Sequence, residues 1–548
     1  MRGDLLWRSI PAMAADAAAR FGDAEAVVDG ERRMSFSQLI ADARRVTAGL
    51  VASGIEPGER AAIWSPNRYE WLVAALGTLG AGAAVVPVNT RFKGEEVRYI
   101  LERSGARVVF TVGEFLGMDY AATIADLRAE LPNLAVVVGF DESSAADHWL
   151  DAFCRVGEAV DADTVDAHWR AVAGDDVSDV LFTSGTTGSP KGVLMTHAQT
   201  LRQFSDWCDM AGLRTGDRYV IVNPFFHMFG YKAGCLASLM QGATIIPKPV
   251  LDVDDLLRTV AAESVTVLPG PPTIYQSILD HPDRDRFDLS SLRLAVTGAA
   301  DIPVDLIRRL HEELPFSTII TGYGLTEAGT VTGTGPDDDF ETIATTVGRA
   351  RPGLEIRIAD DDGNAVAVGE SGEVLVRGYS VMRGYLDDPV ETARAVDADG
   401  WLHTGDLGTL DERGCLRIVG RKKDMFIVGG FNAYPAEIEN LLLGHPAVGR
   451  VAVVGMPDAR LGEVGMAFVV PAPDAEVDPE ELIAWARAAM ANYKVPRAVE
   501  VVDDLPVNAA GKVEKETLRA RAASFPGRSR SAVPRSAHGS TPSPERKG

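Results

Sequence analysis

The sequence predicts an α/β protein with a large N-terminal domain of parallel-rich sheets, a β-rich subdomain and a small α+β C-terminal domain. The chain has 548 residues, more than one hydrophobic core normally serves. Short β-branched runs alternate with helical patterns up to about residue 348, where short strands punctuated by glycine take over. A polar segment at residues 420–424 then precedes a final stretch with strands and helices of its own.

The alternating part predicts parallel sheets covered by helices. Ser35 and Gln38 form a capping-box pattern ahead of an apolar-periodic stretch, which predicts the start of a helix. The longest apolar run, residues 72–88, is interrupted by Thr78 and Pro87, so it favours a buried helix and strand over a membrane span. The expected strands are residues 61–64, 108–112, 180–183, 219–223, 244–247, 265–268, 292–297 and 318–321.

The later part predicts the domain boundaries. We expect strands of a β-rich layer at residues 355–358, 373–377, 416–419 and 425–428. Beyond them, we expect helices at 435–443 and 480–490 and strands at 450–455, 466–470 and 498–502. The last residues are rich in Ser, Pro and Arg and poor in apolar side chains, which indicates disorder. The expected domains are 1–420, a hinge at 421–424, a C-terminal domain at 425–523 and a disordered tail at 524–548.

Composition narrows the function classes. With 54 basic and 78 acidic residues the net charge is −24, which argues against a broad nucleic-acid or anionic-lipid surface. The four cysteines, at positions 154, 208, 235 and 415, show neither CxxC pairing nor zinc spacing. The first residues also lack the apolar core of a signal peptide. We therefore expect a cytoplasmic protein without an integral membrane segment; a homodimer is left open.

Residues 183–191 form a Ser/Thr/Gly-rich loop between two expected strands, and the loop ends in a lysine. Small residues let backbone N–H groups approach an anion closely, the hydroxyl groups add donors, and Lys191 adds a point charge. The loop is not a Walker A motif, because Pro190 precedes the lysine and no Ser or Thr follows it. By itself, the loop predicts a phosphate-binding site.

Further motifs follow along the chain at residues 323–327, 400–406, 420–424, 429–432 and 508–512. Together with the loop, they resemble the ordered motifs of the adenylate-forming (ANL) superfamily, which includes acyl-CoA synthetases, luciferases and adenylation domains. The resemblance covers roughly residues 10–520 and is strongest to FadD-type acyl-CoA synthetases. It implies an ATP-dependent acid:CoA ligase that works through an acyl-adenylate and uses ATP, Mg²⁺, coenzyme A and a small carboxylic acid.

The resemblance also implies roles for individual residues. Glu327 would be the Mg²⁺ ligand, Asp406 would bind the ribose, and His227 would be the gate between the acyl pocket and the CoA tunnel. The implied catalytic residues are Lys512, Glu327, Thr183 and His227. The implied nucleotide and CoA contacts are Thr183, Ser184, Gly185, Thr186, Thr187, Gly188, Ser189, Pro190, Lys191, Gly298, Ala299, Ala300, Gly322, Tyr323, Gly324, Leu325, Thr326, Glu327, Asp406, Arg421, Lys423, Gly429, Gly430, Phe431 and Lys512.

The C-terminal domain is mobile in this family. By resemblance, it would rotate about Lys423 after adenylation, withdrawing Lys512 and bringing residues 429–432 to the site for CoA transfer. Two faces of one domain would then serve the two half-reactions.

The sequence leaves several candidates for the carboxylic acid that is activated. Residues 222–239 resemble the corresponding segment of actinobacterial ligases that activate the propanoate side chain of sterol-derived rings. A medium- or long-chain fatty acid or an aryl acid also fits. The segment between Asn223 and Leu236 has no acidic residue, which argues against an amino-acid-activating domain. An acyl-AMP ligase, a luciferase-like oxygenase and a non-catalytic ATP or CoA sensor are the remaining alternatives, and retention of Glu327, Asp406, Arg421 and Lys512 argues against the sensor.

Overall fold

The computed structural model describes residues 2–142, 145–183, 190–298, 304–428, 431–458, 460–508 and 512–525. The chain divides into two compact units, Met1–Lys423 and Asp424–Gly548.

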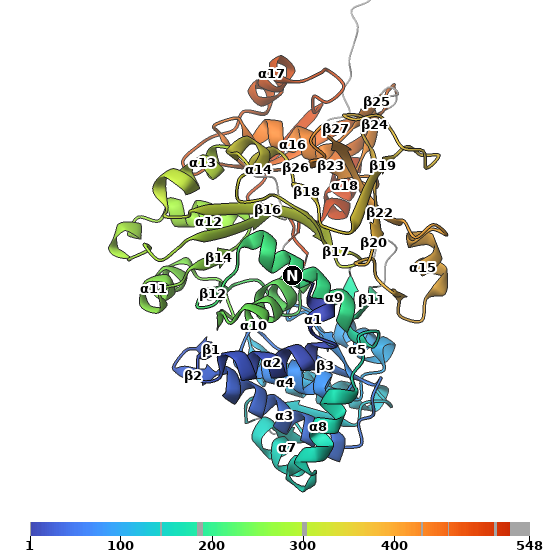
Figure 1. Ribbon diagram of the computed structural model, residues 1–548. Helices are drawn as coiled ribbons and strands as arrows, with labels where there is room; N and C mark the ends of the chain where they lie inside the picture. Colours follow the sequence, from blue (N-terminus) through green and yellow to red (C-terminus); the bar gives the residue numbers. More distant parts are fainter. Residues whose placement is uncertain are drawn as a thin grey trace, which may run out of the picture. The chain divides into compact units, whose positions relative to one another are not determined.

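The first sheet of unit 1 has parallel strands at its centre and antiparallel strands at both edges (Figure 1). Its strands, in spatial order, are β18 (Arg349–Ala350), β17 (Gly329–Gly333), β16 (Thr318–Leu325), β15 (Leu294–Gly298), β14 (Val267–Pro269), β12 (Arg218–Ile221), β13 (Thr244–Pro247), β1 (Glu25–Asp29) and β2 (Arg32–Ser35).

Both faces of this sheet are buried. On one face, alternate residues such as Val220, Leu268 and Ala295 pack with the apolar sides of flanking helices. These helices are α11 (Val253–Glu263), α12 (Pro272–Leu279), α13 (Val304–Glu313) and α14 (Phe340–Thr345). Tyr219 and Leu294, one residue away in sequence, belong instead to the larger core on the other face. Burial on both faces explains the near-continuous apolar runs of these strands.

The second sheet of unit 1 shares that larger core. In spatial order it contains β21 (Gly384–Tyr385), β11 (Lys191–Thr196), β10 (Val177–Thr183), β4 (Ala84–Pro87), β3 (Arg60–Trp64), β5 (Val108–Thr111), β8 (Val136–Gly139) and β9 (His148–Trp149). Helices that bury residues in this core include α2 (Ile10–Phe21), α3 (Phe36–Ala52), α4 (Tyr69–Gly80), α9 (His197–Ala211) and α10 (Ala237–Gln241).

Shorter elements surround these two sheets. The helices are α1 (Gly3–Leu6), α5 (Gly94–Ser104), α6 (Tyr120–Leu127), α7 (Leu150–Val156), α8 (Ala162–Ala171) and α15 (Pro389–Ala395). The 3-10 turns are η1 (Arg128–Glu130), η2 (Gly157–Ala159) and η4 (Arg284–Arg286), η3 (Phe229–Leu236) is a π-helix, and β6 (Glu114–Phe115) pairs with β7 (Met118–Asp119).

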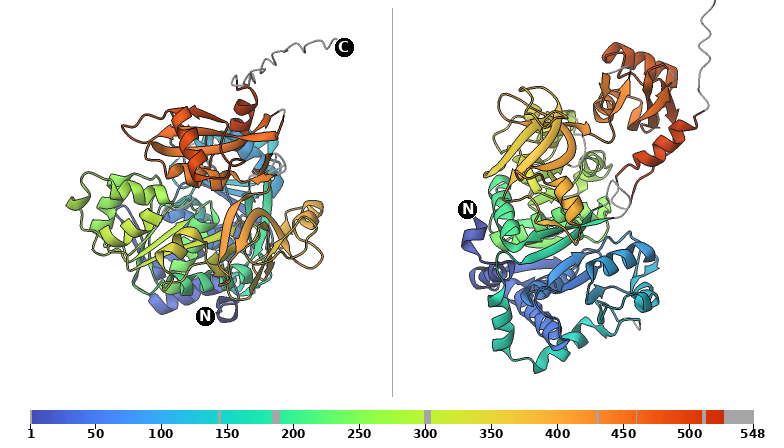
Figure 2. Two further views of the ribbon diagram at one scale, coloured as in Figure 1. Left: turned by 90° about the horizontal axis from the view of Figure 1, so that it is seen from above. Right: turned by 90° about the vertical axis from the view of Figure 1, so that its right-hand side faces the viewer.

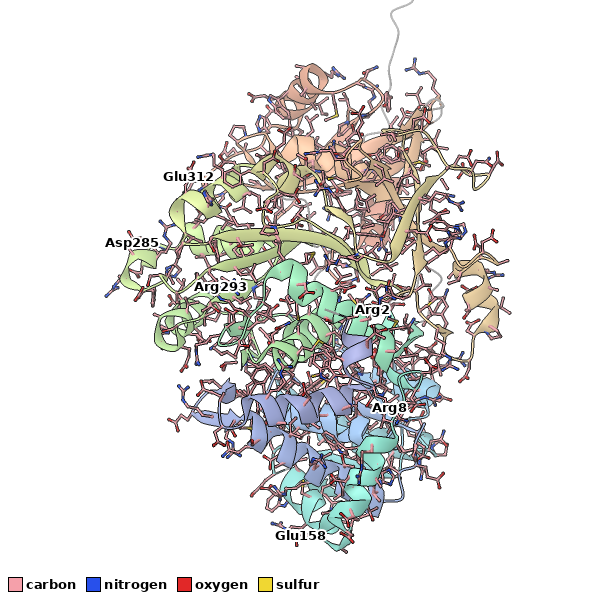
Figure 3. The ribbon with its side chains drawn as sticks, in the orientation of Figure 1. Arg2, Arg8, Glu158, Asp285, Arg293 and Glu312 are labelled. Carbon is pink, nitrogen blue, oxygen red and sulfur yellow. The ribbon has the colours of Figure 1, made fainter. Side chains whose placement is uncertain are left out.

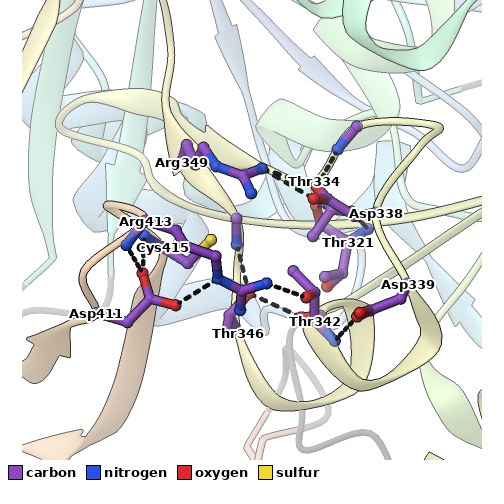
Figure 4. Close-up of polar contacts among 12 residues, drawn as sticks. Thr321, Thr334, Asp338, Asp339, Thr342, Thr346, Arg349, Asp411, Arg413 and Cys415 are labelled. Atoms are coloured by element: carbon purple, nitrogen blue, oxygen red, sulfur yellow. Dashed lines mark hydrogen bonds and ion pairs between the residues drawn. The ribbon is translucent and has the colours of Figure 1, made fainter.

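A smaller antiparallel layer completes unit 1, and polar contacts join it to the first sheet. Its strands are β19 (Leu354–Ala359), β20 (Gly372–Gly378), β22 (Leu402–Leu410) and β23 (Leu416–Arg421). Arg413, in the β22–β23 turn, donates to Thr342 in α14 (3.1 Å), and Asp411 pairs with Arg413 (3.1 Å) (Figure 4). The backbone N–H of Leu416 in β23 donates to the Gly348 carbonyl (2.8 Å), and that of Val347 donates to the Leu416 carbonyl (2.7 Å). These contacts fasten the layer that carries Asp406 to the segment between α14 and β18 of the first sheet.

Unit 2 is one mixed sheet covered on both faces (Figure 2). It contains β25 (Phe431–Ala433), β24 (Phe426–Val428), β27 (Gly462–Pro471) and β26 (Val448–Asp458), with β28 (Ala498–Val501) parallel to β27. Val453 faces α16 (Pro435–Leu443) and α17 (Pro479–Ala489). Its neighbours Ala452 and Val454 face α18 (Lys515–Ala523). Alternation along one strand therefore builds two apolar cores.

Most predicted elements occur in the structure. The capping box forms between Ser35 and Gln38, and the apolar run at residues 72–88 is the buried α4 followed by the buried β4. One strand assignment was wrong: residues 425–428 do not join the β-rich layer, because β24 pairs with β25 and β27 in unit 2. Arg421, placed in the expected hinge, is the last residue of β23. Of the expected tail, only Ser524 and Phe525 are described, and Phe525 packs against the α18 core.

Candidate active site

Most of the predicted nucleotide residues of unit 1 lie where strands end. Strands β12, β14, β15 and β16 run parallel, so their carboxyl ends meet at one edge of the first sheet, where α/β proteins usually bind ligands. Gly298 ends β15 opposite Gly322 of β16. Ala299 and Ala300 lie outside the described residues.

The phosphate loop connects the antiparallel strands β10 and β11 of the second sheet. Thr183, the last residue of β10, lies opposite Lys191, the first residue of β11. The Thr183 hydroxyl donates to the Lys191 carbonyl (3.5 Å), and Tyr99 donates to the carbonyl of Pro190 (3.1 Å). Residues 184–189, namely Ser184, Gly185, Thr186, Thr187, Gly188 and Ser189, lie outside the described residues. The hairpin therefore holds both ends of the loop in register.

Lys191 has two partners that the sequence did not predict. Its ammonium group forms an ion pair with Glu391 of α15, and it lies 5.2 Å from the centre of the Tyr385 ring. Lys191 and Arg394 hold the pKa of Glu391 below its usual range. The charge predicted to meet phosphate is thus balanced by a carboxylate in this structure.

Tyr385 joins the phosphate loop to the predicted metal ligand. Its strand, β21, pairs with β11, and its hydroxyl donates to Glu327 Oε1 (3.0 Å). Burial raises the pKa of Glu327, while the Tyr385 hydrogen bond and the nearby Arg421 oppose that rise. The backbone carbonyl of Glu327 also accepts from Met382 N–H (2.7 Å), which fixes the segment in place.

Glycine is required beside this segment because two strands approach closely. A Cβ atom at Gly324 would lie 2.2 Å from the carbonyl oxygen of Gly329, and one at Gly322 would lie 2.7 Å from that of Thr332. These glycines let β17 pack tightly against β16. Leu325 then ends β16, and Thr326 and Glu327 follow in the turn.

Asp406 lies in a preformed polar cluster. It is only 4% exposed and accepts a hydrogen bond from Tyr323 Oη at 2.5 Å. Arg421, its neighbour across β22 and β23, approaches its other oxygen at 2.9 Å. Burial and the Asp406 carboxylate raise the pKa of Tyr323 well above its usual value. The cluster brings three predicted nucleotide residues together.

His227 is exposed in the loop between β12 and the π-helix η3. The imidazole Nδ1 of His227 accepts from the backbone N–H of Phe229 (3.2 Å), and the backbone N–H of His227 donates to the Pro224 carbonyl (3.0 Å). Buried Asn67 fastens the start of this loop by donating to the Asn223 carbonyl (3.0 Å) and accepting from Phe225 N–H (2.7 Å). The loop conformation is therefore set from within the core.

In unit 2, Lys512 is exposed, and residues 509–511 before it lie outside the described residues. Its backbone N–H donates to Asn508 Oδ1 (3.0 Å), and Asn508 N–H donates to the Lys512 carbonyl (2.8 Å). Gly429 and Gly430 lie outside the described residues, and Phe431 begins β25. Lys423 is the last residue of unit 1.

Neither Tyr385 nor Glu391 was predicted from the sequence. Both follow residues 372–378 in the chain, far from the phosphate loop, and only strand pairing with β11 brings them beside Lys191. The residues around Tyr385 offered no chemical signal of that pairing. In the described part of the chain, no cluster of three or more His, Cys, Asp or Glu side chains could hold a metal ion. Nor does any described helix have the length and apolar character needed to cross a membrane.

Parallel-rich sheets with these polar clusters, followed by a separate α+β unit, define the class of adenylate-forming enzymes. The chain belongs to the AMP-binding enzyme family: residues 14–386 match its main domain and residues 437–512 its C-terminal domain.

Named relatives and a solved structure agree with this membership. A 3-[(3aS,4S,7aS)-7a-methyl-1,5-dioxo-octahydro-1H-inden-4-yl]propanoyl:CoA ligase of Rhodococcus jostii is 49% identical, covering 92% of this chain and 96% of its own length. The ligase of the same name from Mycobacterium tuberculosis is 50% identical, covering 93% and 98%. The structure of an anthranilate CoA ligase in complex with anthranoyl-AMP superposes with a TM-score of 0.85 at 28% identity, covering 95% and 99%. The chain is an AMP-forming acid–CoA ligase that uses ATP and CoA.

Proposed function

We propose that this ligase activates the propanoate side chain of a fused-ring, sterol-derived acid. The observation that carries the proposal is the 49–50% identity, over nearly the whole chain, to two ligases named for the 7a-methyl-1,5-dioxo-octahydroindenyl propanoate. An aryl acid is the second candidate, because a feruloyl-CoA synthase of Amycolatopsis is 38% identical over 91% of this chain.

A substrate panel tests this proposal. Thioester formation would be measured with the ring propanoate, ferulate and a medium-chain fatty acid at saturating ATP and CoA. We expect kcat/KM for the ring propanoate to exceed that for the other acids by at least about 10-fold, a difference of ~1.4 kcal/mol in transition-state binding. A higher kcat/KM for ferulate would replace the first candidate with the second.

The reaction requires two steps, the first at the α-phosphorus of ATP and the second at the carbonyl carbon of the acid. In the first, a carboxylate oxygen attacks the α-phosphorus of ATP, and the bond to pyrophosphate breaks. In the second, the thiol of CoA attacks the acyl carbon, AMP leaves with the electron pair of the C–O bond, and the thiol proton is released. Such phosphoryl chemistry depends on positioning and charge neutralisation.

For the first step, we assign the nucleotide to the edge formed by Lys191, Glu327 and Asp406. The loop from Thr183 to Lys191 would hold the leaving pyrophosphate through backbone N–H groups, hydroxyls and one ammonium. Asp406, held by Tyr323 and Arg421, would accept the ribose hydroxyls. Gly298 and its strand partner Gly322 are assigned to the same nucleotide, as are Ala299 and Ala300.

Glu327 is suited to Mg²⁺ bound by a nucleotide. Such ions use one or two protein carboxylates together with phosphate oxygens, and Glu327 offers one carboxylate fixed by Tyr385. When bound, the ion would neutralise charge on the phosphates. In its absence, Tyr385 and Arg421 favour the ionised form of the Glu327 carboxylate, the form that can bind a cation.

Unit 2 would supply different groups to the two steps. Lys512 would neutralise charge on the carboxylate and α-phosphate during adenylation. Residues 429–431, whose glycines permit close approach of pantetheine, would act during CoA transfer. This assignment requires rotation about Lys423 between the half-reactions, with domains at 1–420 and 425–523. His227 would separate the acyl pocket from the thiol.

The four cysteines are buried free thiols, which fits a reducing compartment such as the cytoplasm. The assignment to the cytoplasm would be tested by fractionating cells that express the tagged chain.

A further inference from the structure

An ion pair is enclosed in the core between β10, α9 and the π-helix η3. Lys232 Nζ lies 2.9 Å from Asp179 Oδ1, and the two side chains are 1% and 0% exposed. Each charged group has a neutral partner as well: Lys232 donates to Thr200 Oγ1 (3.1 Å), and Asp179 Oδ2 accepts from Ser178 Oγ (2.6 Å). Figure 1 shows α9 beside α10, the continuation of η3, and β11, the neighbour of β10.

Overall stability is a poor explanation for this pair. Removing two charges from water is costly, and well-packed apolar side chains of similar volume often serve stability as well or better. A buried pair does, however, impose one arrangement on the elements that carry it, because either charge left alone would be strongly unfavourable. The elements it joins are therefore informative.

Those elements carry the two halves of the proposed site. Asp179 lies four residues before Thr183 on β10, and Lys232 lies five residues after His227. The intervening loop is already fixed at its entry by Asn67. Its exit enters a π-helix, a wide helical turn that proteins use in short pieces and often near functional sites.

Apolar packing also surrounds η3: Tyr231 packs edge-on against Trp71 (5.1 Å between ring centres) and Phe229 against Trp207 (6.2 Å). The ion pair adds a directed contact between two charged groups to this non-directional packing. His197, at the start of α9, is buried, and burial together with the charge of Lys232 lowers its pKa to about 3. His197 is therefore neutral, and the acidic side chain that faces Lys232 is Asp179.

We propose that the Lys232–Asp179 pair is a positioning element that locks the π-helix to β10, and so sets the acyl-side loop of His227 against the phosphate loop that begins at Thr183. In this arrangement the pair determines where the acid carboxylate lies relative to the α-phosphate of ATP. The inference rests on the proposed roles of Thr183 and His227, and it holds for whichever acid the enzyme prefers.

The test replaces both charges with neutral groups of similar size, in the double variant Lys232→Met/Asp179→Asn. KM for the acid should rise about 10-fold and the adenylation rate should fall, because a displaced acyl-side loop no longer aligns the acid carboxylate with the α-phosphate. KM for ATP should stay within about twofold of the wild type. The thermal midpoint should stay near that of the wild type, whereas Lys232→Met alone should lower it clearly.

A matched control uses the Arg293–Asp217 charge pair, which lies at the amino ends of the parallel strands of the first sheet, away from the carboxyl ends assigned to the nucleotide. Arg293, labelled in Figure 3, precedes β15 and donates to Asp217 Oδ1 (2.8 Å), just before β12. The variant Arg293→Met/Asp217→Asn should reduce stability and leave KM for the acid unchanged. A wild-type KM for the acid in the Lys232/Asp179 double variant, or an equal rise for ATP, would overturn the proposal.

If the double variant does not fold, Thr200→Val decides the question, because it removes only the neutral partner of Lys232. We expect about a threefold rise in KM for the acid; an unchanged value would also overturn the proposal. All assays use the acid that the wild type turns over best, so failure of the ring-propanoate assignment shows in the substrate panel and not here.

Discussion

Asp406 and Lys512 are both assigned to the nucleotide, yet the two units hold them in opposite ways. Asp406 is 4% exposed, with Tyr323 and Arg421 each bonded to one of its oxygens. Lys512 is exposed, and Asn508 Oδ1 accepts a hydrogen bond from its backbone N–H. A group that serves every step can be built into a rigid cluster, because the nucleotide stays there. A group that serves only one step must be able to leave the nucleotide after that step. An exposed side chain such as that of Lys512 suits this role, because no buried cluster has to break when it leaves.

The variant Lys512→Ala gives the largest expected effect and tests whether Lys512 acts in only one half-reaction. Removing a charge that acts only in the adenylation transition state should lower acid-dependent pyrophosphate release by about 10²–10³-fold, as for other preorganised charge-stabilising groups. CoA transfer from supplied acyl-adenylate should stay within about threefold, since a charge withdrawn before that step contributes little to its transition state. The two half-reactions would be measured separately.

Lys515→Ala is the matched control, because Lys515 belongs to the same unit and pairs with Glu439 (2.7 Å). It should leave both half-reactions near wild type. Equal losses of both half-reactions in Lys512→Ala would mean that the lysine serves a site common to the two steps, and the contrast with Asp406 would disappear.

Asp406→Asn tests the rigid side of the comparison. Losing the carboxylate weakens the ribose hydrogen bonds and leaves Arg421 without its charged partner, so KM for ATP should rise about 10–100-fold, the range expected for hydrogen bonds to charged groups. KM for the acid should change little. Steady-state kinetics with ATP and acid varied in turn would separate the two constants.

Asp411→Asn provides the control, since Asp411 pairs with Arg413 at the far end of the same β22–β23 hairpin (Figure 4). Its KM for ATP should match the wild type. If Asp406→Asn raised both KM values alike, the cluster would be a structural support and not a nucleotide site.

The two regions also differ in what the sequence could predict. Strands such as residues 244–247 and helix 435–443 follow from local patterns, and the structure has the same bounds. The proximity of Tyr323, Asp406 and Arg421 was implied only by resemblance to a family of ordered motifs. The sequence did not predict Tyr385, Glu391 or the Lys232–Asp179 pair, because contacts between elements far apart in the chain leave no local signature. The strand at 425–428 was assigned to the wrong layer for the same reason.

The variant Tyr385→Phe tests, through the pH dependence of kcat/KM, whether the Glu327 carboxylate controls activity. Burial raises the pKa of Glu327, and the Tyr385 hydrogen bond opposes this rise by favouring the carboxylate; Arg421 also lowers the pKa and Asp406 raises it. Without the hydroxyl, the pKa should rise further. Because the ionised form is needed to bind a cation, activity is lost as pH falls through that pKa. The acid limb of the kcat/KM profile should therefore move to higher pH.

Tyr379→Phe is the control for this shift. Its hydroxyl donates to Asp206 (2.8 Å), so its loss leaves the partners of Glu327 intact, and the acid limb should stay in place. An acid limb that stayed fixed in Tyr385→Phe, or moved to lower pH, would show that Glu327 does not control it.

The smallest expected effect belongs to Asn508, whose side chain holds the backbone of Lys512. Asn508→Ala removes the side-chain oxygen that accepts the Lys512 N–H, while the backbone bond from Asn508 to the Lys512 carbonyl remains. One exposed neutral hydrogen bond is worth about 1 kcal/mol, so adenylation should slow by about two- to fivefold. CoA transfer should not change, because it does not use the lysine. A loss as large as that of Lys512→Ala would mean that adenylation needs the Lys512 backbone to be held as firmly as the Asp406 side chain. In that case, mobility would reside in the movement of the whole unit and not in the accessibility of one side chain.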